Sequence, residues 1–297
     1  MRLANSERQP QNYTASVFVV KPKIMQDSKD QIKQLENKAK QIRRLIIQML
    51  AKAGSGHPGG SLSSTDLVTA LFFSVMRFKA DQPRWPDRDR FHMSKGHCCP
   101  LWYAVLAEAG YFSADKLLTL RQLGSMLQGH PDRRTPGVEA ASGSLGQGLS
   151  VSIGMSLASR IDKKSYRVYC LMGDGEIQEG NIWEGAMAAS HFKCDNLCAI
   201  LDYNGFQIDG KVKDIMGIEP IVDKWRAFGW HTIEINGHDM RQILSAYEEA
   251  GKIKGKPSII IAHTIKGKGV SFMENVVDFH GRAPTKEEAE IALKELS

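Results

Sequence analysis

One stretch, residues 167–210, constrains the fold more than any other part of this 297-residue sequence. It begins with the short apolar run Val168–Met172, which is typical of a buried parallel strand. The chain then turns at Gly173-Asp174-Gly175, continues through a segment with helical periodicity, and reaches a second apolar run, Leu197–Leu201, that ends just before Asn204. This order predicts a βαβ unit. Ligands of open α/β sheets bind beyond the carboxyl ends of the strands, which is where Asp174 and Asn204 are expected.

The residues at these two strand ends suit a divalent cation that holds a diphosphate. Mg²⁺ prefers one or two protein carboxylates together with other oxygen atoms. Asp174 offers a carboxylate, Asn204 an amide oxygen and Phe206 a backbone carbonyl. We also expect a helix to begin near Glu176, with its N-terminal N–H groups directed at the same place. Gly-Asp-Gly alone is ordinary turn chemistry, but its position between a strand and a helix favours the binding site.

Composition narrows the class of protein. The hydrophobic fraction of 42% is enough for a large core, and a charged fraction of 24% does not indicate disorder. The net charge of +6 comes without a dense Lys/Arg block, so we expect attraction for phosphorylated small molecules rather than nucleic acid. No run of apolar residues is long enough to span a membrane. The five cysteines, an odd number without zinc-ribbon spacing, fit reduced thiols in a cytoplasmic protein.

Three histidines in loops each follow a glycine: His57 in SGHPGG, His97 in SKGH and His130 in QGHP. A lone loop histidine is more often a structural hydrogen-bonding group than a catalyst. Dense glycines beside the histidines favour the catalytic alternative, because they let a ligand approach the backbone closely. Neutral or charged imidazoles can donate hydrogen bonds to phosphate or sugar hydroxyls, or move protons near neutral pH. A further glycine cluster, residues 143–148, is expected to open a helix.

The remaining elements complete one α/β domain over residues 28–297, preceded by a flexible arm at residues 1–27. Ser28 is expected to cap a long helix that Gly54 ends. Ser63 and Asp66 have the spacing of a capping box for the next helix. Strands are expected at residues 230–235 and 257–262, with helices at residues 240–250 and after Thr285.

Taken together and in this order, the motifs SGHPGG, SKGH, QGHP, SGSLGQG and GDGEIQEG…DYNGFQIDG resemble the N-terminal, diphosphate-binding domain of transketolases. The resemblance runs from about Leu35 to near the C-terminus, and is greatest to the short, separately encoded N-terminal subunit of split transketolases. It implies a thiamine-diphosphate-binding (PP-type) α/β domain, with a mostly parallel sheet and helices on both faces.

The resemblance also implies roles for individual residues. Asp174, Asn204 and the Phe206 carbonyl would hold Mg²⁺, or Ca²⁺ or Mn²⁺. His57 would assist proton transfer at the reacting carbons, and His130 and His280 would contact the substrate. The cofactor site would be formed by residues of the glycine motifs and the SKGH histidine: His97, Gly143, Leu145, Gly173, Asp174, Gly175 and Asn204.

Two interpretations are possible for several charged residues. Glu179 and Glu184 match carboxylates of a relay across the subunit interface, yet acidic residues near a helix N-terminus are favoured by the helix dipole anyway. Lys266 and Lys268 follow a strand end, where they can approach a phosphate or be solvated. His263 is left without a role. His191, His231 and His238 lie outside the glycine motifs and are interpreted as structural or surface residues. His92, near the SKGH motif, is also left without a role.

The activity implied is transfer of a two-carbon ketol unit from a ketose phosphate to an aldose through thiamine diphosphate, an EC 2.2.1.1-type reaction. In the family, a pyrimidine-binding domain supplies the carboxylate that activates the cofactor, and no segment of this chain resembles that domain. We therefore expect activity only with a separate C-terminal subunit, in an α2β2 heterotetramer. The alternatives are half of a deoxyxylulose-phosphate synthase-like enzyme, a 2-oxo acid dehydrogenase α subunit, or a non-catalytic cofactor-binding protein.

Overall fold

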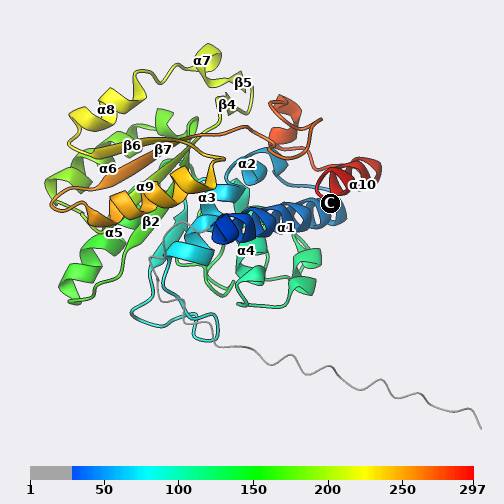
Figure 1. Ribbon diagram of the computed structural model, residues 1–297, viewed down its shortest axis with the longest axis horizontal. Helices are drawn as coiled ribbons and strands as arrows, with labels where there is room; N and C mark the ends of the chain where they lie inside the picture. Colours follow the sequence, from blue (N-terminus) through cyan, green and yellow to red (C-terminus); the bar gives the residue numbers. More distant parts are fainter. Residues whose placement is uncertain (1–28) are drawn as a thin grey trace, which may run out of the picture.

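The computed structural model describes residues 29–297. Its centre is a five-stranded, wholly parallel sheet in the order β1-β2-β3-β7-β6 (Figure 1). The strands are β1 (Arg90–Met93), β2 (Val168–Gly173), β3 (Leu197–Tyr203), β6 (His231–Asn236) and β7 (Ser258–His263). A short antiparallel hairpin, β4 (Phe206–Gln207) and β5 (Gly210–Lys211), follows β3. The predicted parallel α/β class is confirmed.

Ten α-helices within residues 29–297 surround the sheet. They are α1 (Lys29–Ala53), α2 (Pro58–Ser63), α3 (Thr65–Ala70), α4 (Cys99–Glu108), α5 (Gly148–Ile161), α6 (Gly180–His191), α7 (Val212–Ile215), α8 (Ile221–Ala227), α9 (Met240–Lys252) and α10 (Lys286–Glu295). A π-helical turn η1 (Leu71–Val75) and the 3₁₀ turns η2 (Gly96–Cys98), η3 (Ala114–Thr119), η4 (Glu176–Gln178) and η5 (Val277–His280) join them. Within the same part of the chain, no helix is long and apolar enough to cross a membrane.

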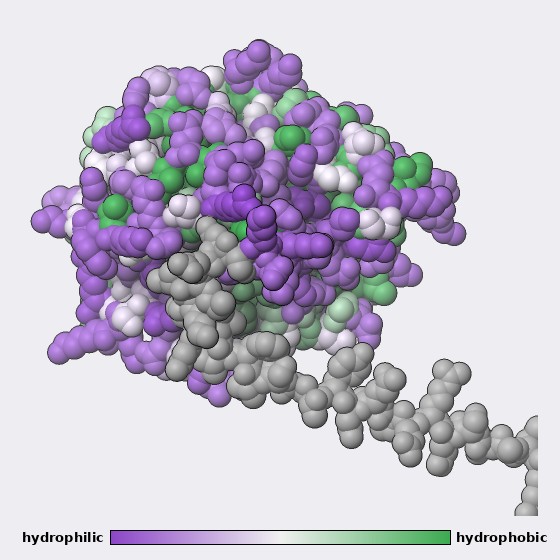
Figure 2. All heavy atoms as spheres, in the orientation of Figure 1, coloured by the Kyte–Doolittle hydropathy of each residue, from purple (hydrophilic) through white to green (hydrophobic). Residues whose placement is uncertain are grey.

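The sheet has helices on both faces because its strands are apolar on both sides. In β2, Tyr169 and Leu171 pack into a core shared with α1, α3, α4 and α9. The alternate residues Val168, Cys170 and Met172 pack into a second core shared with α5, α6 and α8. This is the period of two expected for successive side chains of a strand. On the outside, the face seen in Figure 2 is mainly hydrophilic, with scattered apolar residues.

Two local predictions are wrong and two concern residues that the structure does not describe. Ser63 and Asp66 form no capping box, because Ser63 is the last residue of α2 and Asp66 pairs with Arg43 at 2.7 Å. No α-helix starts near Glu176, where the chain makes only the 3₁₀ turn η4 before α6 begins at Gly180. The predicted arm at residues 1–27 and the Ser28 cap lie outside the described residues. The helix predicted after Thr285 is present as α10, and Thr285 caps it in a capping box with Glu288.

A buried carboxylate at the end of β3 holds the loops at the carboxyl edge of the sheet together. Asp202 accepts hydrogen bonds from Ser63, Lys95, Asn204 and Thr264, which belong to four different segments. Its side chain is fully buried and lies 2.5 Å from the ammonium of Lys95, which is itself almost fully buried. Burial by itself would raise the pKa of Asp202, but the charge of Lys95 holds that pKa below its ordinary value.

We expect Lys95→Met to lower the free energy of unfolding by about 3–5 kcal/mol, because it leaves the Asp202 charge buried without its cation. Urea unfolding at neutral pH measures this difference. The matched control is Lys164→Met, which removes another Lys–Asp pair with side chains 36% and 46% exposed. Exposed pairs contribute about 0–1 kcal/mol. A loss in the Lys95 variant no larger than in the control would contradict the role of this pair.

Candidate active site

Three imidazoles from distant parts of the sequence meet at the carboxyl edge of the sheet. His57 precedes α2, His97 lies in η2 and His280 ends η5. The ring centroid of His57 lies 5.1 Å from that of His97 and 5.7 Å from that of His280, and the His97 and His280 rings stack at 5.2 Å. The structure therefore brings together three of the four histidines that were expected at the site. We call His57, His97 and His280 the histidine cluster.

Burial and neighbouring positive charges keep the histidine cluster neutral at physiological pH. Burial, followed by the charge of Arg121, lowers the pKa of His57 to about 4. Burial, followed by the charge of Lys266, lowers the pKa of His280 to about 3. The pKa of His97 is also lowered, by burial and then by Lys95. Neutral imidazoles can accept protons, and the cations around them favour an anionic ligand.

Lys266 extends into the histidine cluster rather than into solvent. It is 1% exposed, its Nζ lies 2.8 Å from Nδ1 of His280, and it donates to the Phe206 carbonyl at 3.5 Å. Burial lowers the pKa of Lys266 to about 8. Of the two interpretations of Lys266, solvation is therefore wrong. Lys268 is different, because it is partly exposed and pairs with Glu274 at 3.3 Å.

The fourth histidine, His130, lies beside the 143–148 glycine cluster. A Cβ atom added to Gly143 would stand 3.8 Å from the His130 ring. Burial lowers the pKa of His130, and Arg121 lowers it further. Arg121 has a left-handed backbone with φ of 60° and also acts on His57, so its charge reaches both histidines. No motif surrounds Arg121 along the chain, so sequence reasoning had no signal by which to find it.

The three residues predicted to hold a metal lie at one turn after β3 and one after β2. The Asp174 carboxylate accepts from the backbone N–H groups of Gly175 at 2.8 Å and Gly205 at 2.5 Å. The Asn204 amide oxygen accepts from the Phe206 N–H at 3.1 Å. Burial, followed by the charge of Asp202, raises the pKa of Asp174 to about 7.

This donor set fits a hard divalent cation. A carboxylate, an amide oxygen and a backbone carbonyl are oxygen ligands that Mg²⁺ accepts. A buried carboxylate whose pKa is raised by a second carboxylate would also be stabilised by a cation. Within residues 29–297, no group of three His, Cys, Asp or Glu side chains is placed to hold a metal. Amide and carbonyl oxygens are therefore needed to complete the set around Asp174.

The space around these groups is also consistent with a ligand. Nδ1 of His57 is buried and has no hydrogen-bond partner within residues 29–297. A Cβ added to Gly173 would make an ordinary contact at 3.6 Å from Lys95, whereas a Cβ added to Gly175 would crowd Gln207 at 3.1 Å. Leu145 is half-buried after Gly143. A group that approached Gly173 would therefore meet backbone rather than a side chain of that residue.

Glu176 is a further site residue, to which the sequence motifs assign no chemical role. It is 2% exposed and accepts hydrogen bonds from Ser94 and from the backbone N–H groups of Gly146 and Gly173. It therefore connects the SKGH loop, the 143–148 glycine cluster and the end of β2. The signal that could have identified Glu176 is its place directly after Gly173-Asp174-Gly175.

Glu179 and Glu184 lie on the surface of this chain. Glu179 is the N-cap residue of α6, without a side-chain capping hydrogen bond, and Glu184 lies in the second turn of the helix. Both are exposed. Their proposed relay role stays a prediction, and it needs a second surface that covers them.

The other histidines have structural or surface surroundings. Nδ1 of His238 lies 2.8 Å from Asp66 while its Nε2 accepts from the Ile265 N–H, and His231 and His263 pair with glutamates on the surface. His92 is buried, and His191 is exposed.

Comparisons with known proteins give a matching family model and named relatives. Residues 34–296 match the family model described as "Transketolase, thiamine diphosphate binding domain". The chain is 44% identical over 267 residues to one subunit of an apulose-4-phosphate transketolase from Phocaeicola vulgatus, a match that covers 90% of this chain and 95% of the relative. It is 47% identical over 263 residues to one subunit of a 6-deoxy-6-sulfo-D-fructose transketolase from Clostridium sp. (strain MSTE9), a match that covers 88% and 96%.

Solved structures agree in fold and differ in length. Transketolase from Campylobacter jejuni superposes with a TM-score of 0.85 at 34% identity over 89% of this chain. The match covers 43% of that protein, so the chain spans less than half its length.

We expect Asp174→Asn to stabilise the chain at pH 8 when no divalent cation is present. The folded chain keeps the Asp174 proton up to about pH 7, whereas the unfolded chain loses it near 3.8. The contribution of this group to the free energy of unfolding therefore falls as pH rises from about 4 to 7, by at most roughly 4 kcal/mol. The asparagine leaves one backbone N–H without an acceptor, so the net gain is about 1–3 kcal/mol.

Urea unfolding at pH 4 and pH 8 in the presence of a chelator measures this effect. The gain should be absent or reversed at pH 4, where the aspartate is protonated. The control is Asp209→Asn on the exposed turn between β4 and β5. If the difference in free energy of unfolding between the variant and the native chain were the same at both pH values, burial of the Asp174 carboxylate would not destabilise the fold.

We expect Lys266→Met to raise the pKa of His280, because the ammonium of Lys266 is the nearest charge that opposes imidazole protonation. An NMR pH titration of the chain with labelled histidine measures this pKa. Lys268→Met is the matched control, since Lys268 pairs with Glu274 instead. An unchanged His280 titration in the Lys266 variant would exclude the contact.

Proposed function

The chain belongs to the transketolase family through its thiamine diphosphate binding domain, and on that premise we propose that it is the N-terminal subunit of a two-subunit transketolase. The proposal is supported by the lengths of the matched proteins as well as by sequence identity. The relatives named as subunits are covered over 95% and 96% of their length, whereas the solved transketolase from Campylobacter jejuni is covered over 43%.

The observation that carries this proposal is the histidine cluster beside Lys266 and the Asp174–Asn204 oxygens. A group of neutral imidazoles surrounded by cations, next to an oxygen donor set, suits a diphosphate held through Mg²⁺. When bound, thiamine diphosphate supplies a carbon nucleophile for breaking and forming carbon–carbon bonds. The protein supplies position, charge and proton acceptors.

We assign the roles of this chain from the geometry and the family. Asp174, Asn204 and the Phe206 carbonyl hold the cation. His97 and Lys266 face the diphosphate, and the glycine motifs line the cofactor site through Gly143, Leu145, Gly173 and Gly175.

The histidines have different roles toward the substrate. His57, with a pKa of about 4 and a buried Nδ1 that makes no hydrogen bond within residues 29–297, accepts or donates a hydrogen bond as a neutral group at the reacting carbons. His130 and His280 contact substrate hydroxyls. A neutral imidazole is needed here because only the neutral form can take up a proton.

A second subunit completes the site. We propose that it carries the pyrimidine-binding domain and the carboxylate that activates the cofactor, and that two copies of each chain form an α2β2 assembly in the cytoplasm. The exposed Glu179 and Glu184 would become buried at that interface and form the relay. The chain alone is then inactive.

The donor is proposed to be a phosphorylated or sulfonated ketose. The names of two relatives specify apulose 4-phosphate and 6-deoxy-6-sulfo-D-fructose. Because much of the substrate pocket would lie on the partner, the assay should include both of these classes together with xylulose 5-phosphate.

Calorimetry with thiamine diphosphate and Mg²⁺, on this chain alone and with its co-purifying partner, tests the proposal together with a ketol-transfer assay. We expect transfer only in the presence of the partner, and Asp174→Asn should abolish Mg²⁺-dependent cofactor binding despite its higher stability. Binding without ketol transfer would favour another thiamine enzyme. Absence of binding in both samples would refute the proposed function.

We expect His57→Ala to lower kcat of the reconstituted complex by about 10²–10⁴-fold, the usual contribution of a group that transfers protons. Steady-state kinetics measures this effect, with cofactor affinity as a separate readout. His191→Ala, at an exposed position on α6, is the matched control. Unchanged turnover would remove His57 from the catalytic groups.

A further inference from the structure

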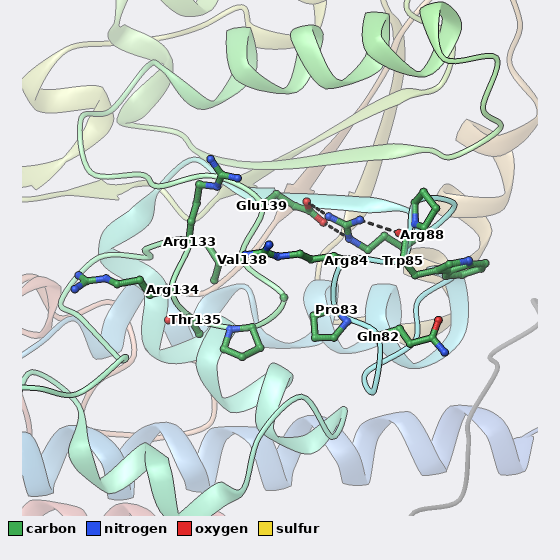
Figure 3. A pocket seen from close by; sticks show the side chains of 13 residues that line it. Gln82, Pro83, Arg84, Trp85, Arg88, Arg133, Arg134, Thr135, Val138 and Glu139 are labelled. Carbon is green, nitrogen blue, oxygen red and sulfur yellow. Dashed lines mark hydrogen bonds and ion pairs between the residues drawn. The ribbon is translucent and has the colours of Figure 1, made fainter.

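A cavity is present whose lining includes no residue of the histidine cluster. It has a volume of about 990 Å³, is open to solvent, and lies between residues 82–88, which lead into β1, and residues 133–139, which precede α5 (Figure 3). The histidine cluster, Lys266 and Asp174 are not among its lining residues. Its size is at the upper end of the range found for small-molecule sites.

The lining of this cavity is strongly positive. Four arginines line it, namely Arg84, Arg88, Arg133 and Arg134, against the single carboxylate of Glu139. Arg88 donates two hydrogen bonds of 2.9 and 2.5 Å to Glu139, and Arg90 approaches the same carboxylate at 3.7 Å. The charge of Glu139 is thus already balanced by the arginines around it.

Two of the four arginines have no hydrogen-bond or ion-pair partner in the described part of the chain. Arg134 pairs with Asp132 at 2.7 Å. Figure 3 draws interactions at Arg88 and Glu139 but none at Arg84 or Arg133, and neither makes a hydrogen bond or ion pair within residues 29–297. Both are exposed. Among residues 29–297, the cavity therefore offers two guanidinium groups whose donors make no hydrogen bond.

The two loops that form the cavity are each fixed by hydrogen bonds. On one side Arg88 donates to the Trp85 carbonyl and Arg90 to the Pro86 carbonyl, so the 82–88 loop is attached to the start of β1. On the other side Thr135 is buried and donates to the Met126 carbonyl. Loops that are already ordered lose less conformational entropy when a ligand binds.

The segment that carries Arg133 is closed on itself near the active site. The Ser142 N–H donates to the Pro131 carbonyl at 3.3 Å, so His130 and Gly143 lie just beyond the two ends of the closed segment. Arg133 lies within it. The cavity and the candidate active site are thus joined by one loop but lined by different residues.

We propose that this cavity binds a phosphate monoester, with Arg84 and Arg133 as the principal ligands. A phosphate monoester carries about two negative charges at pH 7, which matches two guanidinium groups with free donors. Arginine binds phosphate through two parallel N–H donors, a geometry that lysine cannot provide. Trp85 and the prolines at positions 83, 86 and 136 form an apolar wall that can hold the organic part of the ligand.

A titration with inorganic phosphate tests this site on the full chain labelled with ¹⁵N-tryptophan, at constant ionic strength. The indole signal of Trp85, which lines the cavity, reports binding there, and those of the buried Trp102 and Trp225 are internal controls. We expect a saturable shift of the Trp85 signal with a Kd on the order of 1 mM. Because this signal is local, phosphate bound at the histidine cluster does not produce the result.

The Arg84→Ala/Arg133→Ala variant should weaken this binding by about tenfold or more, equivalent to at least about 1.4 kcal/mol. Arg226→Ala/Arg241→Ala removes the same charge from exposed positions elsewhere and should leave it unchanged. No saturable shift, an equal shift with chloride, or binding retained by the first variant would each overturn the proposal.

A parallel titration with ribose 5-phosphate distinguishes two sources of the phosphate group. Tighter binding than inorganic phosphate supports a sugar phosphate whose organic part contacts the apolar wall. Equal binding supports a site that recognises the phosphate group alone. Neither titration uses the partner subunit, so their outcome is independent of ketol transfer.

Discussion

The buried carboxylate of Asp202 holds the candidate active site in place. It pairs with Lys95 and accepts hydrogen bonds from side chains of three further segments. Each of these segments carries or adjoins a group of the site: α2 follows His57, the Lys95 loop leads to His97, and Thr264 precedes Lys266. A single buried ion pair thereby sets the relative positions of groups that are far apart in the sequence.

Around this pair the protein concentrates groups whose charge states are unfavourable in the absence of a ligand. Burial raises the pKa of Asp174 to about 7 and lowers that of Lys266 to about 8. In a site built only for stability, such groups would be replaced or paired. Their presence next to the buried Nδ1 of His57 is typical of a binding site, where a bound cation and anion supply the missing charges.

The hydrophobic cores and the titratable residues of the site occupy different parts of the fold. Both faces of the sheet are covered by apolar helix surfaces, and the titratable residues of the site gather at the carboxyl edge of the strands. Glu179 and Glu184 are exposed, at the N-cap and in the second turn of α6. In the proposed two-subunit enzyme, a chain built this way can share this edge with a second chain without any change to its own core.

Local sequence patterns were enough to predict the parallel α/β class and the loops that carry chemistry. Apolar runs identify β2 and β3, and the Gly-His and Gly-Asp-Gly motifs mark loops, because both signals depend on residues that are near one another along the chain. His57, His97 and Asp174 could be chosen on that basis, whereas His280 was chosen only because the motifs resemble a known family.

Which side chains meet in the folded chain depended instead on packing between distant segments. The partners of Asp202 come from four segments, Glu176 joins three, and Lys266 reaches His280 instead of solvent. The arginine cavity likewise forms from two loops that no local pattern connects. The neighbours of Ser63 along the chain suggest a helix cap, whereas its hydroxyl donates to Asp202 across the fold, because long-range contacts are not encoded in local spacing.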